Sequence, residues 1–369
     1  MQPPPKAKII CIFLLIFCVP CYTVYSLFYL QEAGIEKGGG EMLLLSKDDI
    51  RRVFSMTDAI RADKEAFRLF SAGQCEVPLR TQIKAPKYDG TFLFMPAYIP
   101  ALDYSVEKIV NIFPRNSGKN IPTAPAQVLL IDGTNGMIAA ILDGMYLTQL
   151  RTGAASGAAF DLLARRECRK GTVIGTGSQA AAQVEAMLTV RILEQINVFD
   201  RNPRRAEQFA QQMRASFPYF SGRIVASSSV QDAVCDADLL ITVTSAETPV
   251  FDGTLVKAGA TVSCVGAYQP RMQEMDPRLL YRASKIYFDS QEAVLAEAGD
   301  IIIPLREGII TENDFTGELG EVVAGTIPAR ESENEIIVFK TVGIAAQDLV
   351  TAMRIYDKSV AAGIGTQWL

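Results

Sequence analysis

Residues 171–182 combine residue types and spacing that suit nucleotide binding. Gly175, Gly177 and Ala180 follow the order G-x-G-x-x-A, in which the first glycine forms a turn, the second lets a pyrophosphate approach and the small third residue lets helix and strand pack. A phosphate would bind the free N–H groups at the positive end of that helix. The spacing alone also fits an ordinary strand-turn-helix. Asp200, however, follows about 20 residues later, where a carboxylate can bind both ribose hydroxyls, so we predict a dinucleotide site for NAD or NADP.

The sequence contains no histidine, which limits its acid–base chemistry. Histidine general bases, histidine metal ligands and Ser-His-Asp triads are all excluded. Proton transfer must therefore use Lys, Asp, Glu, Tyr, Cys or water. The seven cysteines supply no second pair beside the C-x-x-C spacing of Cys18 and Cys21, so we predict no metal site and a reducing, cytoplasmic location.

The charge of the chain argues against one class of partner. The 369 residues carry a net charge of −5 at neutral pH, and basic residues form no concentrated run. Nucleic acid is therefore not an expected partner. The length suggests about two domains.

The elements around the glycine turn predict a parallel, doubly wound sheet. The β-branched run 172–174 suits a strand, the run 179–188 is rich in Ala, Met and Leu and suits a helix, and 196–200 suits a second strand. The alternation continues with a helix and four more strands, at 203–217, 223–226, 239–244, 261–265 and 285–288. Strands that alternate with helices form a parallel sheet covered on both faces.

The remaining segments predict a second domain of the α+β class. We expect a helix after a Ser46 cap, a second helix, a mostly antiparallel sheet that ends in a hairpin, a helix that leads into the nucleotide region, and one last helix. The first two helices cover 46–52 and 58–70. The sheet covers 77–143, and its hairpin strands are 128–131 and 138–142. The helix that leads into the nucleotide region covers 148–165, and the last helix covers 339–360.

Together these patterns predict an α/β protein in which a doubly wound Rossmann sheet is inserted in a mixed or antiparallel α+β domain. We assign 42–160 to the first part of the α+β domain, 161–310 to the nucleotide-binding domain, and 311–369 to the return of the chain to the α+β domain.

Residues 1–41 are excluded from this fold. Residues 9–30 form an uncharged run that is long enough to span a bilayer, and long for the apolar region of a signal peptide. Residues 36–41 precede Met42, and the codons of Glu, Lys and Gly make this stretch purine-rich, like a ribosome-binding site before a start codon. We therefore expect translation to start at Met42, with 1–41 an artefact of the gene model. The alternative is a membrane anchor through residues 9–30.

Several phrases of the chain, taken in order, resemble those of the ornithine cyclodeaminase/μ-crystallin family. They are V-P-L-R at 77–80, M-P-A at 95–97, V-E-K-I-V at 106–110, L-R-T-G-A-A-S at 150–156, G-T-G-S-Q-A at 175–180, A-G-D at 298–300, E-L-G-E at 318–321 and F-K-T-V-G at 339–343. The likeness covers nearly all of the chain from Met42. It implies a homodimer of two-domain subunits, with a substrate and dimerisation domain, an inserted Rossmann domain and an active site in the cleft.

The resemblance also implies site residues. Arg80 and Lys108 match basic residues that hold the substrate carboxylate, and Arg151 matches an arginine that touches substrate and cofactor. Arginine suits bidentate carboxylate binding, and burial would lower the pKa of Lys108, which makes it the catalytic candidate. Tyr268 and Val342 complete the implied substrate contacts. The implied cofactor contacts are Thr123, Arg151, Gly175, Gly177, Ser178, Gln179, Asp200, Arg201, Thr244, Val265 and Thr341.

One phrase departs from the family pattern. Cyclodeaminases carry a catalytic Asp in a phrase similar to G-G-D-x-P-G-K, whereas this chain has V-G-A-Y-Q-P-R-M at 265–272. Tyr268 stands at the Asp position and Met272 at the Lys position, so a carboxylate that moves a proton at the substrate amine is missing. The phrase looks more like that of the reductase branch, which reduces imines or oxo acids with NAD(P)H.

We therefore expect an NAD(P)-dependent oxidoreductase of a small amino or imino acid, acting on a cyclic imine such as 1-pyrroline-2-carboxylate. Two alternatives stay open: ornithine cyclodeamination to proline and ammonia with catalytic NAD, and a non-catalytic protein that binds NADPH and a small ligand. The choice of cofactor is also open. Asp200 slightly favours NAD because it repels a 2′-phosphate, whereas Arg201, Arg204 and Arg205 could bind that phosphate.

Overall fold

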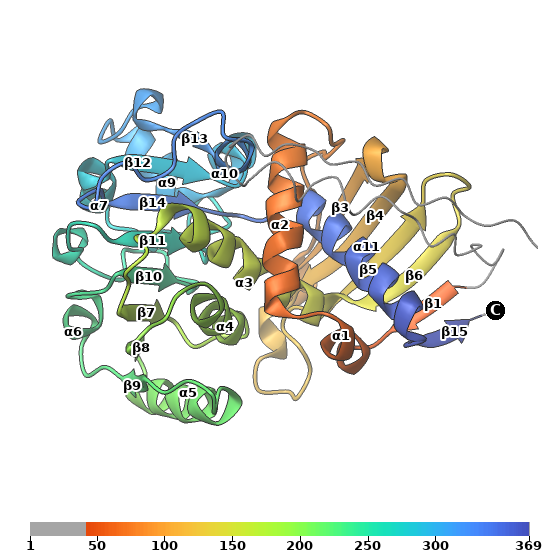
Figure 1. Ribbon diagram of the computed structural model, residues 1–369, viewed down its shortest axis with the longest axis horizontal. Coiled ribbons are helices and arrows are strands. Elements are labelled where there is room, and N and C mark those ends of the chain that lie inside the picture. Colours follow the sequence, from red (N-terminus) through yellow and green to blue (C-terminus); the bar gives the residue numbers. More distant parts are fainter. Residues whose placement is uncertain (1–41, 369) are drawn as a thin grey trace, which may run out of the picture. The chain divides into compact units, whose positions relative to one another are not determined.

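The computed structural model describes residues 42–368, and within them two β-sheets are flanked by helices (Figure 1). The predicted fold class, a Rossmann sheet inserted in an α+β domain, is confirmed. The expectations for residues 1–41, including the membrane anchor, lie outside the described part of the chain. Within residues 42–368, every helix is too short or too polar to span a bilayer.

The seven-stranded sheet belongs to the α+β domain. In the order of their pairing its strands are β15 (Thr366–Trp368), β1 (Met42–Leu45), β6 (Ile138–Asp143), β5 (Ala126–Asp132), β4 (Tyr104–Ile112), β3 (Gly90–Ile99) and β2 (Thr81–Ala85). Strands β2 to β6 pair antiparallel in sequence order, and β5 and β6 form the predicted hairpin. Strand β1 pairs parallel with β6 and antiparallel with β15.

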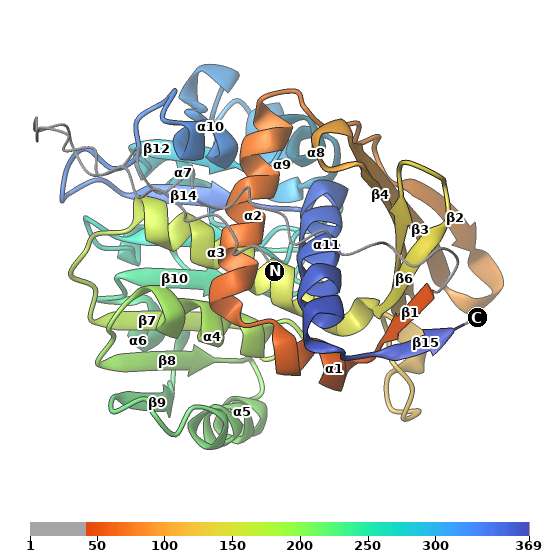
Figure 2. The same cartoon turned by 45° about the vertical axis from the view of Figure 1, so that its right-hand side comes forward.

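Long helices cover one face of this sheet. They are α3 (Gly144–Leu163) and α11 (Ala345–Ala362), while α1 (Lys47–Val53) and α2 (Met56–Ser71) pack on α11. Ser46 caps α1 as predicted, through a reciprocal pair of hydrogen bonds with Asp49. Helix α11 lies across β3, β4 and β5 beside α2, as Figures 1 and 2 show. Helix α3 contacts strands of both sheets, so it joins the two halves of the fold.

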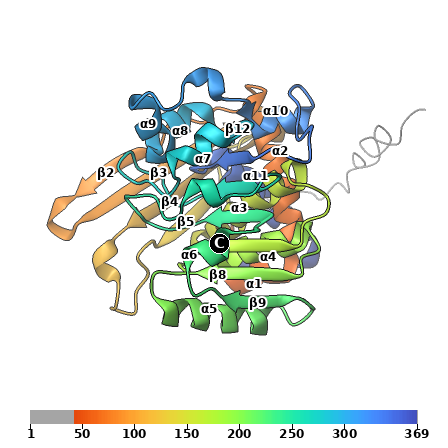
Figure 3. The ribbon, with the colours of Figure 1, turned by 90° about the vertical axis from the view of Figure 1, so that its left-hand side faces the viewer.

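The eight-stranded sheet is the nucleotide-binding half. Its order is β13 (Gly317–Glu318), β12 (Lys285–Phe288), β14 (Ile337–Lys340), β11 (Thr261–Cys264), β10 (Leu239–Thr242), β7 (Lys170–Ile174), β8 (Gln195–Phe199) and β9 (Arg223–Ala226). All neighbouring strands are parallel, and Figure 3 shows them from β12 at the top to β9 at the bottom. The strand order reverses at β7, which is where doubly wound sheets bind ligands.

Shorter helices connect these strands. They are α4 (Ala180–Val190), α5 (Pro203–Ser216), α6 (Val230–Val234), α7 (Pro277–Arg282), α8 (Gln291–Glu297), α9 (Gly299–Arg306) and α10 (Leu319–Ala324).

The prediction of one helix over 339–360 is wrong at its start. Residues 337–340 form the buried strand β14, and α11 begins only at Ala345, after Gly343 with a φ of +79°. The run Ile337-Val338-Phe339 is β-branched and aromatic, and it fits between two strands of a fully buried sheet. Strands β13 and β14 therefore extend the nucleotide-binding sheet beyond the predicted range 161–310.

Candidate active site

The glycine turn after β7 leaves its backbone open to a ligand. Gly175 has a φ of +105°, and a Cβ there would lie 2.8 Å from the carbonyl oxygen of Val243. A Cβ on Gly177 would meet no described atom within 4 Å. Helix α4 begins at Ala180 with no side chain from residues 42–368 capping it, and Oε1 of Gln179 is buried without a hydrogen-bond partner among them. The free backbone N–H donors of this turn fit the pyrophosphate of a dinucleotide.

Asp200 follows β8, and its carboxylate faces the glycine turn. Oδ2 accepts a hydrogen bond from Oγ1 of Thr176 at 2.6 Å, and Oδ1 accepts one from the backbone N–H of Asn202 at 2.9 Å. Burial raises the pKa of Asp200, but these hydrogen bonds and the Arg205 guanidinium outweigh it, so the pKa lies below its usual value. Arg205 Nε lies 4.0 Å from Oδ2, and Arg201 is exposed. The ionised carboxylate is thus available to ribose hydroxyls.

Three further predicted cofactor contacts lie on the same edge of the sheet. Thr244 follows β10, Val265 follows β11, and Thr341 follows β14. These strands are neighbours of each other and of β7, so their carboxyl ends lie beside the glycine turn. Val265 and Thr341 are buried, and Thr244 is half-buried.

Buried charges fix the loops at this edge. Glu274 accepts hydrogen bonds from the backbone N–H groups of Thr244 and, at 2.6 Å, Gly266. Asp300 accepts from the N–H of Glu274 at 2.7 Å, and Lys340 Nζ lies 3.1 Å from the other oxygen of Asp300. Burial raises the pKa of Glu274 to about 7, and the charge of Asp300 contributes to the rise.

Tyr268 lies on the segment that these charges fix. A Cβ on Gly266 would lie 2.0 Å from the carbonyl oxygen of Thr244, so the two loops pack too closely for a larger residue. Burial raises the pKa of Tyr268, and the positive charges of Arg271 and Arg80 only partly offset the rise. The phenol is therefore neutral at pH 7, where it can donate a hydrogen bond but cannot replace a carboxylate base.

Lys108 is buried because of its place on β4. Tyr104, Val106 and Lys108 alternate onto the face that α11 covers. Lys108 Nζ lies 2.6 Å from Oδ2 of Asp348, and the exposed fractions of the two side chains are 1% and 0%. Burial and the nearby charge of Arg151 lower the pKa of Lys108 to about 7, although Asp348 favours the charged form. A lysine with this pKa can hold or release a proton near neutral pH.

Arg151 approaches the same carboxylate from α3. Its Nε lies 3.2 Å from Oδ1 of Asp348, and its Nη1 donates to Oε1 of Gln347 at 3.4 Å. Gln347 in turn donates to Oδ2 of Asp63 at 2.8 Å. Burial raises the pKa of Asp63 well above its usual value, which favours the neutral carboxyl. Lys108 and Arg151 therefore share the carboxylate of Asp348.

Helix α3 also brings Arg151 beside the nucleotide turn. A Cβ on Gly153 would lie 2.6 Å from the carbonyl oxygen of Ala182, so α3 and α4 pack at backbone distance. Gln183 Nε2 donates to the carbonyl oxygen of Thr152 at 3.1 Å, which ties the two helices together. One helix thus connects the cations to the predicted phosphate site.

Arg80, which precedes β2, reaches the loop after β14. Its Nη2 donates to the carbonyl oxygens of Val342 at 3.2 Å and Gly343 at 2.9 Å, and lies 2.9 Å from Oε2 of Glu297. Its Nε and Nη1 have no hydrogen-bond partner in the described part of the chain. A guanidinium that is held at one nitrogen and free at two suits bidentate binding of a carboxylate.

Asp289, which follows β12, fixes the loop that holds Arg80. One of its oxygens accepts hydrogen bonds from the Thr341 hydroxyl and from the next two N–H groups, at 2.6, 2.9 and 2.6 Å. A Cβ on Gly343 in this loop would lie 2.2 Å from Arg151 Nη1. The loop therefore sits between two of the three predicted carboxylate-binding cations.

A small cavity of about 30 Å³ lies beside Arg80. Its wall includes Val77, Met95 and Ile344, together with the charged Arg80 and Glu297. Apolar side chains and two opposite charges thus face each other beside the free nitrogens of Arg80.

Two predicted cofactor residues are not brought into this site. Thr123 is exposed on the loop before β5, where its carbonyl oxygen accepts a hydrogen bond from Phe113 at 2.8 Å. Arg201 is exposed beside Asp200 and makes no hydrogen bond or ion pair with residues 42–368. For both residues, contact with the cofactor stays a prediction.

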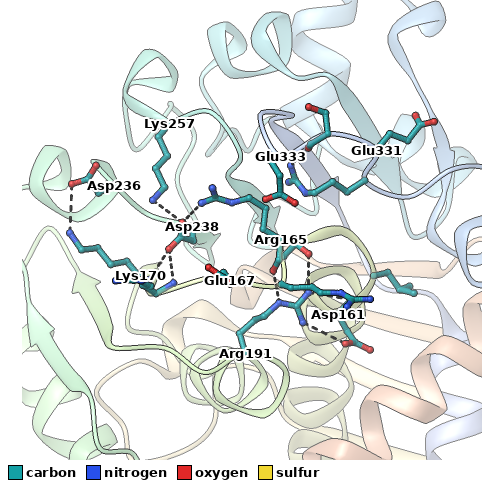
Figure 4. A pocket seen from close by; sticks show the side chains of 16 residues that line it. Asp161, Arg165, Glu167, Lys170, Arg191, Asp236, Asp238, Lys257, Glu331 and Glu333 are labelled. Atoms are coloured by element: carbon teal, nitrogen blue, oxygen red, sulfur yellow. Dashed lines mark hydrogen bonds and ion pairs between the residues drawn. The ribbon is translucent and has the colours of Figure 1, made fainter.

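A larger cavity, of about 960 Å³, lies at the opposite edge of the eight-stranded sheet (Figure 4). Asp238 stands at its centre and accepts hydrogen bonds from the backbone N–H groups of Arg169 and Lys170, at 2.7 and 2.9 Å. Arg165 pairs with Asp238, and Lys257 Nζ lies 2.7 Å from it. Lys170 begins β7, so this cavity lies at the amino ends of the strands, away from the glycine turn. We assign its ion pairs a structural role.

Three carboxylates central to the site were not predicted from the sequence: Glu274, Asp289 and Asp348. Asp289 had a signal, because it directly follows a predicted strand and the carboxyl ends of parallel strands meet at the ligand edge. Asp348 had none, because it lies inside a helix and its partner Lys108 is 240 residues away in the sequence.

Known proteins resemble this chain over most of its length. The sequence model of the ornithine cyclodeaminase/mu-crystallin family matches residues 41–363. A Delta(1)-pyrroline-2-carboxylate reductase of Bacillus cereus is 36% identical over 324 residues, which cover 88% of this chain and 98% of that protein. The solved Delta(1)-pyrroline-2-carboxylate reductase of Thermococcus litoralis, in complex with NADH and L-proline, has 38% identity and a TM-score of 0.84, with coverage of 88% of this chain and 99% of that one. An archaeal alanine dehydrogenase dimer with bound NAD has 31% identity and a TM-score of 0.81, with coverage of 89% and 99%.

The resemblance inferred from the ordered phrases is thus confirmed over the folded part of the chain. The chain belongs to the ornithine cyclodeaminase/mu-crystallin family.

Proposed function

We propose that this protein is an NAD(P)-dependent oxidoreductase that reduces a cyclic imine such as 1-pyrroline-2-carboxylate, with NADH as the favoured cofactor. The observation that carries the proposal is that Arg80 and Arg151 meet at Gly343, at the ligand edge of the Rossmann sheet, while Lys108 shares the Asp348 carboxylate with Arg151. The Bacillus relative is named for this reaction, and the Thermococcus structure holds NADH and L-proline, which supports the choice of substrate.

The cations select and orient a carboxylate. Arg80 offers two free guanidinium nitrogens, and Arg151 faces the same loop from α3. Two guanidinium groups fix both the position and the plane of a carboxylate, which aligns the attached ring with the apolar wall at Val77 and Met95. A flat, five-membered ring that carries one carboxylate satisfies this arrangement.

Lys108 handles the proton. NADH, when bound, supplies a hydride to the imine carbon. The nitrogen of the C=N bond takes up the electron pair and needs a proton, which the Lys108 ammonium can donate because its pKa is about 7. Tyr268 is neutral and can donate a hydrogen bond to the ligand, but it cannot accept the proton of a substrate amine as an Asp would.

The residues of the glycine turn and Asp200 would hold the cofactor. Gly175, Gly177 and the first N–H groups of α4 suit the pyrophosphate. Asp200 suits the adenosine ribose, and its negative charge disfavours the 2′-phosphate of NADP. Arg205, 4.0 Å away, is the residue that would lessen this preference.

A homodimer is part of the proposal. Helices cover one face of the seven-stranded sheet, while large apolar side chains on its strands are exposed, among them Ile83, Ile138 and Trp368 with exposed fractions of 52%, 37% and 59%. These strands run from one edge of the sheet to the other, and we propose that a second chain packs on this sheet. The archaeal alanine dehydrogenase relative is a dimer. Light scattering of the purified protein tests this part of the proposal.

A substrate screen tests the reaction. Purified protein is mixed with NADH or NADPH and a panel of cyclic imines and 2-oxo acids with amines, and absorbance at the nicotinamide band is followed. We expect the fastest loss of NADH with 1-pyrroline-2-carboxylate. Ammonia release from ornithine without net change in NADH would instead indicate a cyclodeaminase. Tight NADPH binding without turnover on the whole panel would indicate a binding protein.

A further inference from the structure

The charges around Lys108 do not balance in the ligand-free protein when Lys108 is protonated. Lys108 Nζ and Arg151 Nε lie 2.6 and 3.2 Å from the two oxygens of Asp348. The exposed fractions of the three side chains are 1%, 7% and 0%, so water screens these charges very little. Two cations and one carboxylate leave one positive charge in excess in a buried site, and a buried charge without a counter-charge is strongly disfavoured.

The neighbouring groups do not remove this excess. Arg80 adds a third cation, but Glu297 pairs with it at 2.9 Å. Asp63 on α2 reaches the cluster only through Gln347, and its burial favours the neutral form. The strands beside β4 contribute no charge, because Met95 on β3 and Val128 on β5 are opposite Lys108.

Asp289 is the remaining carboxylate near the cluster, on the far side of the loop 341–343. Its oxygens accept hydrogen bonds from the Thr341 hydroxyl and from three backbone N–H groups, those of Ser290, Val342 and Gly343. Its charge is therefore stabilised by neutral donors of the loop and makes no direct contact with Lys108 or Arg151.

We propose that Asp348 is a positioning residue that holds Lys108 and Arg151 on one shared carboxylate, so that protonation of Lys108 leaves one positive charge in excess until a bound carboxylate balances it and draws a proton from solvent onto Lys108. The proposal rests on the proposed function only in that the ligand carries a carboxylate.

The direction of the proton transfer follows from the electrostatics. Burial and Arg151 lower the pKa of Lys108 to about 7 in the ligand-free protein, so the lysine is mostly neutral at pH 8. A ligand carboxylate beside the same cations supplies the missing counter-charge and raises the pKa of Lys108. Between the two pKa values, binding is therefore coupled to the uptake of a proton by the protein.

The proton gained in this way is the one that the reduction consumes. Reduction of an imine adds one hydride to carbon and one proton to nitrogen, so the overall reaction takes up one proton from solvent. Loading Lys108 only when a carboxylate is bound would deliver this proton to Nζ at the moment when the imine is in place. When a ring without a carboxylate binds, Lys108 would stay largely neutral above pH 7.

Titration calorimetry on the protein saturated with NADH tests the proposal directly. The probe is pyrrole-2-carboxylate, a flat ring that carries a carboxylate and cannot accept a hydride. The binding heat is measured at pH 8 in two buffers of different ionisation enthalpy, and the difference gives the number of protons taken up. The matched control ligand is pyrrole-2-carboxamide, which has nearly the same shape and no charge.

We expect uptake of about one proton per site for the carboxylate at pH 8, and an uptake that falls towards zero at pH 6, where Lys108 is already protonated. The carboxamide should bind without proton uptake or not bind. A binding heat for the carboxylate that is the same in both buffers at pH 8 would overturn the proposal, and so would the absence of carboxylate binding.

Variants assign the proton to this cluster. Lys108→Met should abolish the uptake at pH 8. Asp348→Asn should reduce it, because the excess becomes two charges and the pKa of Lys108 falls further in both states. The matched control is Glu107→Gln, which removes a carboxylate from the opposite face of the same strand and should leave the uptake unchanged. Equal uptake in Asp348→Asn and the wild type would overturn the role of Asp348.

These outcomes are independent of the substrate assay. Carboxylate binding with proton uptake but without reduction of any imine would disprove the proposed reaction and keep the role of Asp348. Reduction of 1-pyrroline-2-carboxylate without proton uptake on binding would do the reverse. If Asp348→Asn does not fold, the buffer comparison on the wild type still decides the question.

Discussion

Gly343 lies directly against the guanidinium of Arg151: a Cβ on Gly343 would be 2.2 Å from Arg151 Nη1. The same glycine presents its carbonyl oxygen to Arg80 at 2.9 Å and its N–H to Asp289 at 2.6 Å. One residue without a side chain is therefore the point where both arginines and the loop-fixing carboxylate meet.

Replacing Gly343 by alanine should raise the KM for the imine at least about tenfold. The methyl group would displace the Arg151 guanidinium, and the φ of +79° is strained for a residue with a Cβ by about 1–2 kcal/mol. NADH affinity, read from fluorescence titration, should change little. Gly363→Ala is the matched control, because Gly363 has a φ of +63° and no described atom within 4 Å of its Cβ position. That variant should lose stability but keep the KM.

Glu297→Gln should raise the KM for the imine by several fold and leave the affinity for NADH unchanged. The Glu297 carboxylate holds one nitrogen of Arg80 at 2.9 Å, and a neutral amide holds it more weakly. Glu292→Gln removes an exposed carboxylate from the wall of the same cavity and should leave steady-state kinetics unchanged. A lower KM in Glu297→Gln would mean that Glu297 competes with the substrate for Arg80 instead of orienting it.

The pH dependence of the reaction should differ between kcat/KM and kcat. The kcat/KM profile reports the free enzyme. Because the pKa of Lys108 is lowered to about 7, the protonated lysine is present below that pH and is lost as the pH rises through it. We expect kcat/KM to fall about tenfold per pH unit above 7, and kcat to fall only at higher pH, since a bound carboxylate keeps Lys108 protonated. A kcat/KM that stays level from pH 6 to 9 would exclude Lys108 as the proton donor.

Asp200→Ala should weaken the binding of NADH more than that of NADPH. The loss of a charged hydrogen bond to ribose corresponds to roughly 1.5–3 kcal/mol, or about 10- to 100-fold in the Kd for NADH. For NADPH the loss of repulsion offsets part of this cost. Asp232→Ala, at an exposed position in the first turn of α6, is the control for a general change of charge in the same domain. Equal losses for both cofactors would show that Asp200 does not determine the preference.

The wild-type protein should release little or no ammonia from ornithine. Burial keeps the Tyr268 phenol neutral, so the position that holds an Asp in cyclodeaminases offers no base. A coupled assay for ammonia, run with NAD and ornithine and compared with imine reduction under the same conditions, checks this. Efficient conversion of ornithine to proline and ammonia would show that another residue supplies the base.

The sequence predictions succeeded where residues close together in the sequence determine the structure, and failed where distant residues determine it. Local signals held where neighbours along the chain determine the structure, as in the Ser46 cap, the β5–β6 hairpin and the glycine turn at Gly175. They failed where distant partners decide it. The first two residues of the predicted helix 339–360 belong instead to strand β14, because β11 and β12, which are distant in the sequence, lie on either side of it.

The predictions of site residues show the same difference between local and distant signals. Arg80, Lys108 and Arg151 could be named because their phrases resemble those of a family, and the structure places them together. No sequence pattern around Asp348 indicates its role, because Asp348 meets Lys108 only when α11 packs on β4. Charges that balance each other across the core cannot be paired from the sequence of either partner.

The arrangement of α11 has a consequence for the order in which the protein matures on the ribosome. Asp348 is 240 residues from Lys108 and 197 from Arg151 along the chain, and all eight strands of the nucleotide-binding sheet are translated in between. The two cations emerge long before the carboxylate that holds them. The delay is longer still between β1 and β15, which are neighbours in the sheet but far apart along the chain. Domains of a nascent chain fold as their residues emerge. The nucleotide-binding sheet can therefore be folded while the seven-stranded sheet still lacks α11 and β15. A truncated chain that ends before α11 would bind the cofactor but would not reduce the substrate.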